Sequence, residues 1–239
     1  MNKFLYRAGS ENAATREAGI PAQRSRREFL SSVVALPLAG AVGWQSMPRA
    51  PQTRPMRTPQ VVTFVGGAAG TWRVLRTEAV VGPPLPPVER VAVYEGERAL
   101  QQNGAWTLRG VVGHLRYTTQ REREQLAAVQ AGLGRPDATY AAFIPIKKSE
   151  AWWGLAQDQR RAIFEEGSHH IRASMKYLPA IARRLHHSRD LGEPFDFLTW
   201  FEFAPQHAPL FDELVAMLRS TEEWKYVEHE VDIRLQRSK

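Results

Sequence analysis

The adjacent histidines His169 and His170 are the residues of this sequence whose surroundings best suit metal binding. Helical spacing of three and four residues places His170 on an apolar stripe made of Ile163, Gly167, His170, Ile171, Ser174 and Leu178. His169 shares its helix face with charged residues, namely Glu165, Glu166, Arg172 and Lys176. A helix over this segment is therefore predicted to point His170 toward the interior and His169 toward solvent.

An inward histidine is more often a core residue than a metal ligand. The small residues Gly167, Ala173 and Ser174 leave room beside the His170 imidazole, where a flat cofactor could approach. The chain has no cysteine and no HExxH pattern. That composition excludes thiolate zinc sites, iron–sulfur ligation and haem attachment through cysteine. A single histidine suits a haem iron, whose equatorial ligands belong to the porphyrin.

A hairpin is predicted downstream of this helix. Arg183 and Leu185 stand two residues apart, as do Thr199 and Phe201, so each pair shares one face of a strand. A polar turn over 189–194 would join the two strands and bring both pairs onto one surface. Such a surface is an apolar pocket with one positive charge and one hydroxyl. The alternative is an amphipathic hairpin whose arginine pairs with a surface carboxylate. The pocket has no obvious distal histidine.

The elements that must position these residues alternate between strands and helices. Period-two patterns and turn residues predict strands over 61–65, 72–81, 90–94, 106–118, 140–146, 195–203 and 226–235. Helices are predicted over 119–131 with Thr119 as the N-cap, over roughly 149–178 and over 208–219. The pattern predicts an α+β fold, in which two ferredoxin-like halves form antiparallel sheets covered by helices. A Gly-rich phosphate loop and a nucleophile elbow are absent, which leaves nucleotide-binding and serine-hydrolase functions without support.

The net charge of +7 comes mostly from the first quarter of the chain. Residues 1–60 contain nine Lys and Arg but three Asp and Glu, which leaves 23 basic and 22 acidic residues in the remainder. A nearly neutral folded part offers no basic stripe for a phosphate backbone. Nucleic-acid binding is therefore not expected.

The segment 1–60 is predicted to be an export signal followed by a linker, and 61–239 to be the folded domain. Ser25-Arg26-Arg27-Glu28-Phe29-Leu30 has the twin-arginine form, and a mildly apolar run extends to Trp44. That run is shorter than the about 20 apolar residues of a transmembrane helix. The alternative is a short hydrophobic helix beside two arginines. The signal predicts a transient partner, the twin-arginine (Tat) translocon, a periplasmic location and no stable membrane association.

Three groups of residues match the pattern of one known family. They are Ile144-Pro145-Ile146-Lys147-Lys148 with Trp152-Trp153; His170 followed thirteen residues later by Arg183, then Leu185, His187 and Ser188; and Asp196-Phe197, Thr199, Phe201 and Glu202. In this arrangement the chain resembles the chlorite dismutase family of haem b enzymes, from about residue 116 to residue 231. The resemblance implies a dimeric α+β barrel and a homo-oligomer. The short first half is similar to the smaller-subunit branch, which favours a dimer over a pentamer.

The resemblance also implies roles for individual residues. His170 would bind the haem iron, and Glu223, or alternatively Glu222, would accept a hydrogen bond from its other ring nitrogen. Arg183 would be the distal arginine that retains an anion. The remaining residues would contact the cofactor: Leu185, Thr199 and Phe201 on the distal side, and Tyr117, Lys148 and Trp152 at the propionates or the haem edge. Without the resemblance, Trp152 and Trp153 would be assigned to the core and Lys148 to the surface.

The implied reaction converts chlorite to chloride and dioxygen, and a similar oxyanion or a peroxide is the alternative substrate. Arginine stays charged at working pH and pairs with oxyanions, which suits Arg183 to the retention of an anion. Two other functions remain open. A coproheme decarboxylase-like enzyme usually lacks the distal arginine and is cytoplasmic. A non-catalytic periplasmic haem-binding protein, either a carrier or a sensor, would need no such residue.

Overall fold

The structure of the chain is a computed structural model that describes residues 60–96, 103–113 and 116–238. The chain divides into two units, Met1–Arg54 and Pro55–Lys239. The predicted export signal and most of the linker lie outside the described residues. No helix of the described part is long and apolar enough to cross a membrane.

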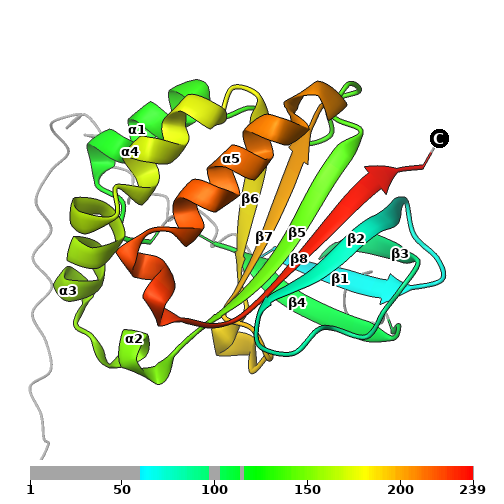
Figure 1. The fold of residues 1–239 in the computed structure, drawn as a ribbon, viewed down its shortest axis with the longest axis horizontal. Coiled ribbons are helices and arrows are strands. Elements are labelled where there is room, and N and C mark those ends of the chain that lie inside the picture. Colours follow the sequence, from blue (N-terminus) through cyan, green and yellow to red (C-terminus); the bar gives the residue numbers. More distant parts are fainter. Residues whose placement is uncertain (1–59, 97–102, 114–115, 239) are drawn as a thin grey trace, which may run out of the picture. The chain divides into compact units, whose positions relative to one another are not determined.

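Eight antiparallel strands form a closed barrel (Figure 1). They are β1 Val61–Gly67, β2 Trp72–Val81, β3 Arg90–Glu95, β4 Trp106–Val112, β5 Tyr140–Lys148, β6 Ile181–His187, β7 Phe197–Phe203 and β8 Val227–Arg237. Their order around the barrel is β1-β3-β2-β8-β5-β7-β6-β4. The four strands of each half are therefore contiguous, and the halves meet at β2–β8 and at β4–β6.

The helices gather on the half formed by β5 to β8 (Figure 1). They are α1 Gln120–Val129, α2 Glu150–Gly154, α3 Gln157–Arg161, α4 His170–Ser174 and α5 Ala208–Arg219, with a π-helical turn at Ala162–Gly167 and a 3₁₀ turn at Glu222–Tyr226. The predicted α+β fold class is confirmed, but the helical cover is uneven. No helix is described between consecutive strands of the β1–β4 half, apart from any in the undescribed residues 97–102.

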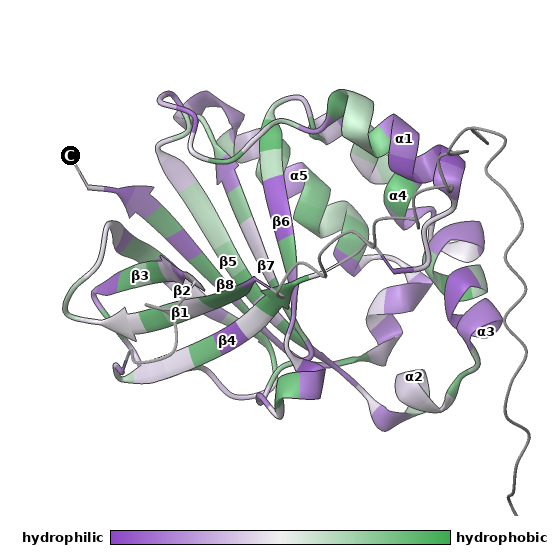
Figure 2. Cartoon of the chain, turned by 180° about the vertical axis from the view of Figure 1, so that it is seen from behind, coloured by the Kyte–Doolittle hydropathy of each residue, from purple (hydrophilic) through white to green (hydrophobic). Residues whose placement is uncertain are grey.

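Alternate residues of the strands supply two separate apolar layers. Phe64, Phe143 and Trp200 meet inside the barrel, where the rings of Phe64 and Phe143 stack with centroids 4.3 Å apart. On the outer face of the same sheet, Phe201 packs against Phe211 of α5. Hydrophobic and hydrophilic bands alternate along the strands in Figure 2, as a sheet with two different environments requires.

Several element boundaries agree with the sequence patterns, and one strand is shorter than predicted. β2 and α5 have the predicted bounds, and Thr119 caps α1 through a capping box with Glu122. β4 ends at Val112 instead of residue 118. The backbone of Tyr117 has a φ of +60°, a left-handed conformation that cannot continue a strand.

Helices fill the range 149–178 as predicted, but the unbroken helical stripe expected from Ile163 to Leu178 is wrong, because the backbone breaks before His170. His169 has a φ of +52° and separates the π-helical turn from α4. The Glu165 carboxylate reaches across the break and accepts hydrogen bonds from the Ile171 and Arg172 backbone N–H groups at 2.6 and 3.2 Å. Glu165 is therefore buried, although the helical pattern placed it on a solvated face. Its carboxylate satisfies amides that the break leaves without helical partners.

Candidate functional site

A cavity of about 1140 Å³, counted out to its open mouth, lies between the β5–β7–β6 sheet and the helices. We call it the helix-side cavity. All nine residues singled out from the sequence line it, and they come from six segments of the chain: Tyr117, Lys148, Trp152, His170, Arg183, Leu185, Thr199, Phe201 and Glu223. The fold thus brings together residues up to 106 positions apart in the sequence (117 to 223).

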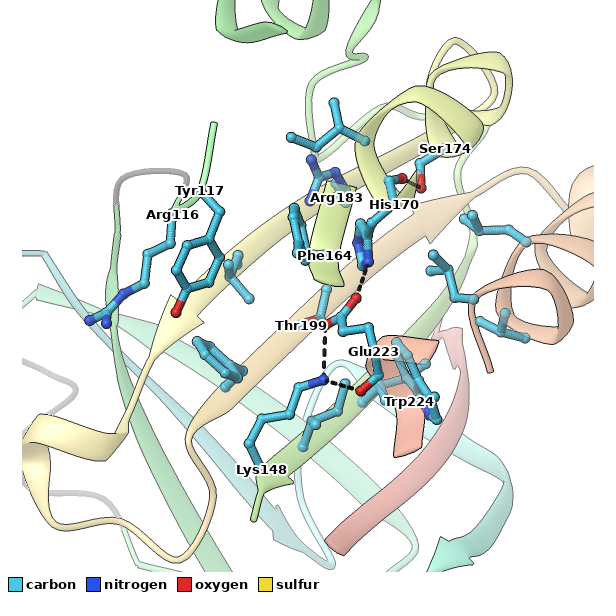
Figure 3. Close-up of a pocket in the computed structure, with 18 of the residues that line it drawn as sticks. Arg116, Tyr117, Lys148, Phe164, His170, Ser174, Arg183, Thr199, Glu223 and Trp224 are labelled. Atoms are coloured by element: carbon cyan, nitrogen blue, oxygen red, sulfur yellow. Dashed lines mark hydrogen bonds and ion pairs between the residues drawn. The ribbon is translucent and has the colours of Figure 1, made fainter. Parts of the chain in front are cut away.

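His170 enters the cavity from the first turn of α4 (Figure 3). Its Nδ1 lies 2.7 Å from Oε2 of Glu223, and the Phe164 ring stacks on the imidazole with centroids 4.3 Å apart. Because Nδ1 donates to the carboxylate, Nε2 is left as the nitrogen that can bind a metal. His169 is exposed, and its Nδ1 lies 2.9 Å from the Glu165 carbonyl oxygen. The predicted separation of the two histidines is confirmed, although a helix break produces it and not a continuous helix.

Glu223, and not Glu222, is the hydrogen-bond partner of His170. Glu223 is buried in the 3₁₀ turn before β8, whereas Glu222 points to solvent. Burial by itself would raise the pKa of the Glu223 carboxyl, but His170 and Lys148 more than offset it through charge and hydrogen bonds, and the pKa is lowered. The carboxylate is therefore ionised, which makes the bound imidazole a stronger donor to a metal.

Lys148 holds the other oxygen of the same carboxylate. Its Nζ donates to Oε1 of Glu223 at 2.8 Å and lies over the rings of Trp152 and Trp224, 4.9 and 5.2 Å from their centroids. The residue is only 3% exposed, so the assignment of Lys148 to the surface does not apply. The resemblance assigned Lys148 to the haem propionates or the haem edge. In the structure its ammonium is paired with Glu223. The propionate role stays a prediction.

The predicted hairpin is formed by β6 and β7. Arg183 is paired across the strands with Phe201, and Leu185 with Thr199, so all four side chains face the helix-side cavity. Desolvation by burial lowers the pKa of Arg183. Within the described ranges no carboxylate forms an ion pair with this guanidinium, and the surface pairing belongs to the next residue, Arg184, with Glu95. The cavity therefore contains a cation without an anionic partner from the described chain.

Tyr117 and Trp152 meet edge to face on another side of the cavity, with ring centroids 6.0 Å apart. The Tyr117 hydroxyl accepts a hydrogen bond from Arg160 at 3.1 Å, and its carbonyl accepts one from Arg161. Arg116 also lines the cavity. Basic groups around Tyr117 suit the carboxylates of a cofactor that lies with one edge toward them.

The structure adds lining residues that the sequence patterns did not identify. His187 follows Leu185 at the same two-residue spacing and also lines the cavity, although the sequence offered no obvious distal histidine. Strand alternation could have placed it. Phe164, Trp224 and Glu230 also line the cavity, as does the apolar face of α5. Their contribution depends on packing between distant segments, for which the sequence carries no local signal.

These residues fit a haem. The cavity is large and mostly apolar, it contains one histidine whose Nδ1 is fixed by a carboxylate, and it has basic groups near Tyr117. A planar macrocycle that brings its own four nitrogen ligands needs only one axial residue from the chain. Among the described residues no group of three or more His, Asp or Glu side chains could hold a metal ion.

The closed barrel and the helices that cover one half of it place the chain in the class of α+β-barrel proteins. The family model described as chlorite dismutase matches residues 89–238. This chain belongs to the chlorite dismutase family.

The chain is also similar to solved structures of chlorite dismutases. The dimeric chlorite dismutase of Nitrobacter winogradskyi is 56% identical, with a TM-score of 0.71 over 74% of this chain and 99% of that one. A mutant chlorite dismutase of Candidatus Nitrospira defluvii is 20% identical, with a TM-score of 0.56 over 75% of this chain and 92% of that one, and it shares the fold.

A curated relative matches over a shorter stretch. The chlorite dismutase of Ideonella dechloratans is 34% identical over 87 residues, which is 36% of this chain and 28% of that one. The match therefore spans little more than a quarter of that relative's length.

Proposed function

We propose that the protein binds haem b through His170 and converts chlorite to chloride and dioxygen. Family membership supports the reaction, and the His170–Glu223–Lys148 chain supports the cofactor. Haem b, when bound, supplies the iron at which an oxygen atom leaves chlorite. The reaction is balanced without another reactant, because the two oxygen atoms of one chlorite become one dioxygen molecule.

The unpaired guanidinium of Arg183 is the observation that carries this proposal. Arg183 is half-buried, and a desolvated cation without a carboxylate is costly unless an anion compensates it. Chlorite provides that anion on entry. An oxyanion fragment of chlorite that stays beside Arg183 remains available for forming the oxygen–oxygen bond. Leu185, Thr199 and Phe201 surround the same space and keep bulk water away, which strengthens the ion pair.

An oxygen electrode tests the reaction directly. Purified protein with one haem per chain should release one dioxygen per chlorite consumed, over many turnovers. A haem carrier or sensor would bind the cofactor and release no oxygen beyond stoichiometric amounts, and that outcome would contradict the proposed enzyme activity.

The neighbouring arginines provide a matched test of anion retention. Arg183→Ala should bind haem normally but complete fewer turnovers before the Soret absorbance is lost, because oxyanion that escapes from the cavity oxidises the porphyrin. Arg184→Ala should behave like the parent, since Arg184 faces the other side of β6. Equal durability of the Arg183 variant and the parent would count against the retention role.

We also propose that the protein forms a homodimer and is exported to the periplasm by the Tat pathway. A dimeric relative at 56% identity supports the first statement, and the twin arginines Arg26 and Arg27 support the second. Light scattering should give twice the mass of the chain. Residues 1–60 fused to a reporter should direct its export, and Arg26→Lys with Arg27→Lys should block it.

A further inference from the structure

A fully buried carboxylate, Glu230, lies beside the cofactor site without contacting His170, Glu223 or Lys148 by a hydrogen bond or ion pair in the described chain. Glu230 belongs to β8 and is 0% exposed. It pairs across the strands with Ile146 of β5, and both residues line the helix-side cavity. A buried carboxylate is costly unless its oxygens are used, so its partners indicate what it does there.

Glu230 divides its two oxygens between two different donors. Oε1 accepts hydrogen bonds from Nε and Nη2 of Arg219 at 2.9 and 2.6 Å. Oε2 accepts a hydrogen bond from Nε1 of Trp224 at 2.7 Å. The Arg219 guanidinium compensates the charge of the carboxylate, and the Trp224 indole is fixed by an acceptor that is part of an ion pair.

The fixed indole lies next to the ammonium of Lys148 (Figure 3). Nζ of Lys148 lies over the Trp224 ring, 5.2 Å from its centroid. A ring whose N–H donates to a carboxylate gains electron density, which strengthens its attraction for a cation. Glu230 therefore helps to hold Lys148 in the position from which Nζ donates to Oε1 of Glu223.

The position of Lys148 determines how the charge of Glu223 is shared. Glu223 offers Oε1 to Lys148 at 2.8 Å and Oε2 to Nδ1 of His170 at 2.7 Å. An ammonium at Oε1 draws negative charge away from Oε2, which makes Oε2 a weaker acceptor for the His170 N–H. Displacement of the ammonium would leave more of this charge for His170 and make the imidazole a stronger donor to a metal.

We propose that Glu230 is a positioning residue of the cofactor site, which fixes Trp224, keeps Lys148 on Glu223 and thereby limits how strongly His170 donates to the haem iron. This inference rests on the proposed haem ligation by His170 and not on the chlorite reaction. The alternative is a purely structural role, in which Glu230 serves only to anchor Arg219, the last residue of α5, to β8.

Two variants and a control separate these roles. Glu230→Gln keeps the shape but has one acceptor oxygen, which the Arg219 cation takes, so the amide NH₂ faces the indole and Trp224 loses its acceptor. Trp224→Phe keeps an aromatic ring but removes the N–H, and it leaves the Glu230–Arg219 pair in place. Asp232→Asn is the matched control, because Asp232 is equally buried and accepts from the same Arg219 at 2.9 Å, whereas the Trp224 N–H goes to Glu230.

Resonance Raman spectra of the ferrous haem-loaded protein and a redox titration measure the effect. In Glu230→Gln and Trp224→Phe, the iron–histidine stretch should move to higher wavenumber and the ferric/ferrous midpoint potential should fall, because a stronger histidine donor stabilises ferric iron. In Asp232→Asn both values should match those of the parent. Unchanged values in the first two variants, a shift in the opposite direction, or an equal shift in Asp232→Asn would overturn the proposal.

Trp224→Phe decides the matter even when Glu230→Gln does not fold, since it preserves the buried ion pair. The spectrum of the parent distinguishes this inference from the proposed function. A parent without an iron–histidine band would contradict ligation by His170, and both proposals would fall. A normal band that the two variants leave in place contradicts the role of Glu230 alone.

Discussion

His170 and His186 lie on opposite sides of the β6–β7 sheet, and both use Nδ1 to fix the ring and direct Nε2 elsewhere. Their partners differ. His170 donates to the Glu223 carboxylate, whose charge is shared with Lys148. His186 donates to a neutral backbone carbonyl. A carboxylate strengthens the imidazole as a metal ligand, whereas a carbonyl in an apolar interior leaves it a weak, uncharged acceptor. The partner of the other nitrogen therefore decides which chemistry a buried histidine can perform.

Removal of His170 should give the largest effect. His170→Ala is expected to abolish stoichiometric haem binding, because it removes the imidazole that Glu223 holds by Nδ1 and whose Nε2 is proposed to bind the iron. Haem content per chain, measured by pyridine haemochrome absorbance, checks this outcome. The matched control is His169→Gly, which suits the positive φ at that position and should bind haem like the parent. Unchanged haem binding by the His170→Ala variant would contradict the assignment of His170 as the iron ligand.

Neutralisation of Glu223 should give the next largest effect, a loss of folding stability. Glu223→Gln leaves the buried Lys148 ammonium without its counter-charge, and such losses cost about 3–5 kcal/mol. Urea unfolding of the haem-loaded protein measures the change. Glu222→Gln, at an exposed position, should stay within about 0.5 kcal/mol of the parent.

A double variant separates charge from shape. Lys148→Met added to Glu223→Gln should recover part of the lost stability, since it removes the unpaired charge. A double variant no more stable than Glu223→Gln would show that the buried charge is not the cause of the loss.

His186, inside the barrel, should make the free energy of unfolding depend on pH. The pKa of His186 is lowered from 6.5 to about 4. Between these values the unfolded chain binds a proton that the folded chain does not, so the free energy of unfolding decreases as the pH falls. This decrease in the free energy of unfolding reaches about 3 kcal/mol below pH 4, and roughly 2 kcal/mol of the decrease has already occurred at pH 5.

His186→Gln isolates this contribution, because glutamine does not titrate. The parent should lose roughly 2 kcal/mol more than the variant between pH 7.5 and pH 5 in urea unfolding. Parallel pH dependence in the two proteins would show that His186 is not held neutral by burial.

Arg184 should give the smallest effect. It is about one-third exposed and pairs with Glu95 on the barrel side of β6. Ion pairs with this exposure contribute about 0.2–1 kcal/mol, so Arg184→Ala should lower the free energy of unfolding by no more than that. A loss above about 2 kcal/mol would mean that Arg184 also supports the packing inside the barrel.

Local periodicity predicted much of the fold and of the helix-side cavity. The two-residue spacing of Arg183 and Leu185, and of Thr199 and Phe201, was enough to place all four on one face, as β6 and β7 confirm. The bounds of β2 and α5 followed from their patterns in the same way. These features depend on neighbours within a few residues of each other.

Features that depend on distant partners were not predictable. The helix break at His169 is stabilised by Glu165 bonding to amides beyond the break, and helical periodicity assumes that no such break exists. The burial of Lys148 depends on Glu223, 75 residues away. The interior of the barrel depends on the closure of eight strands, so Trp72, Trp200 and His186 gave no joint signal along the sequence.

The five-residue length of α4 has a consequence for how the cofactor is loaded. A helix of that size does not persist alone in water, and α4 relies on Glu165 at its start and on Glu223 holding His170. Haem bound at His170, as proposed, would add a further tether to the same turn. The amides of α4 should therefore exchange with deuterium much more slowly once haem is bound, while those of β7 change little. Cofactor insertion and the ordering of this turn would then be thermodynamically coupled.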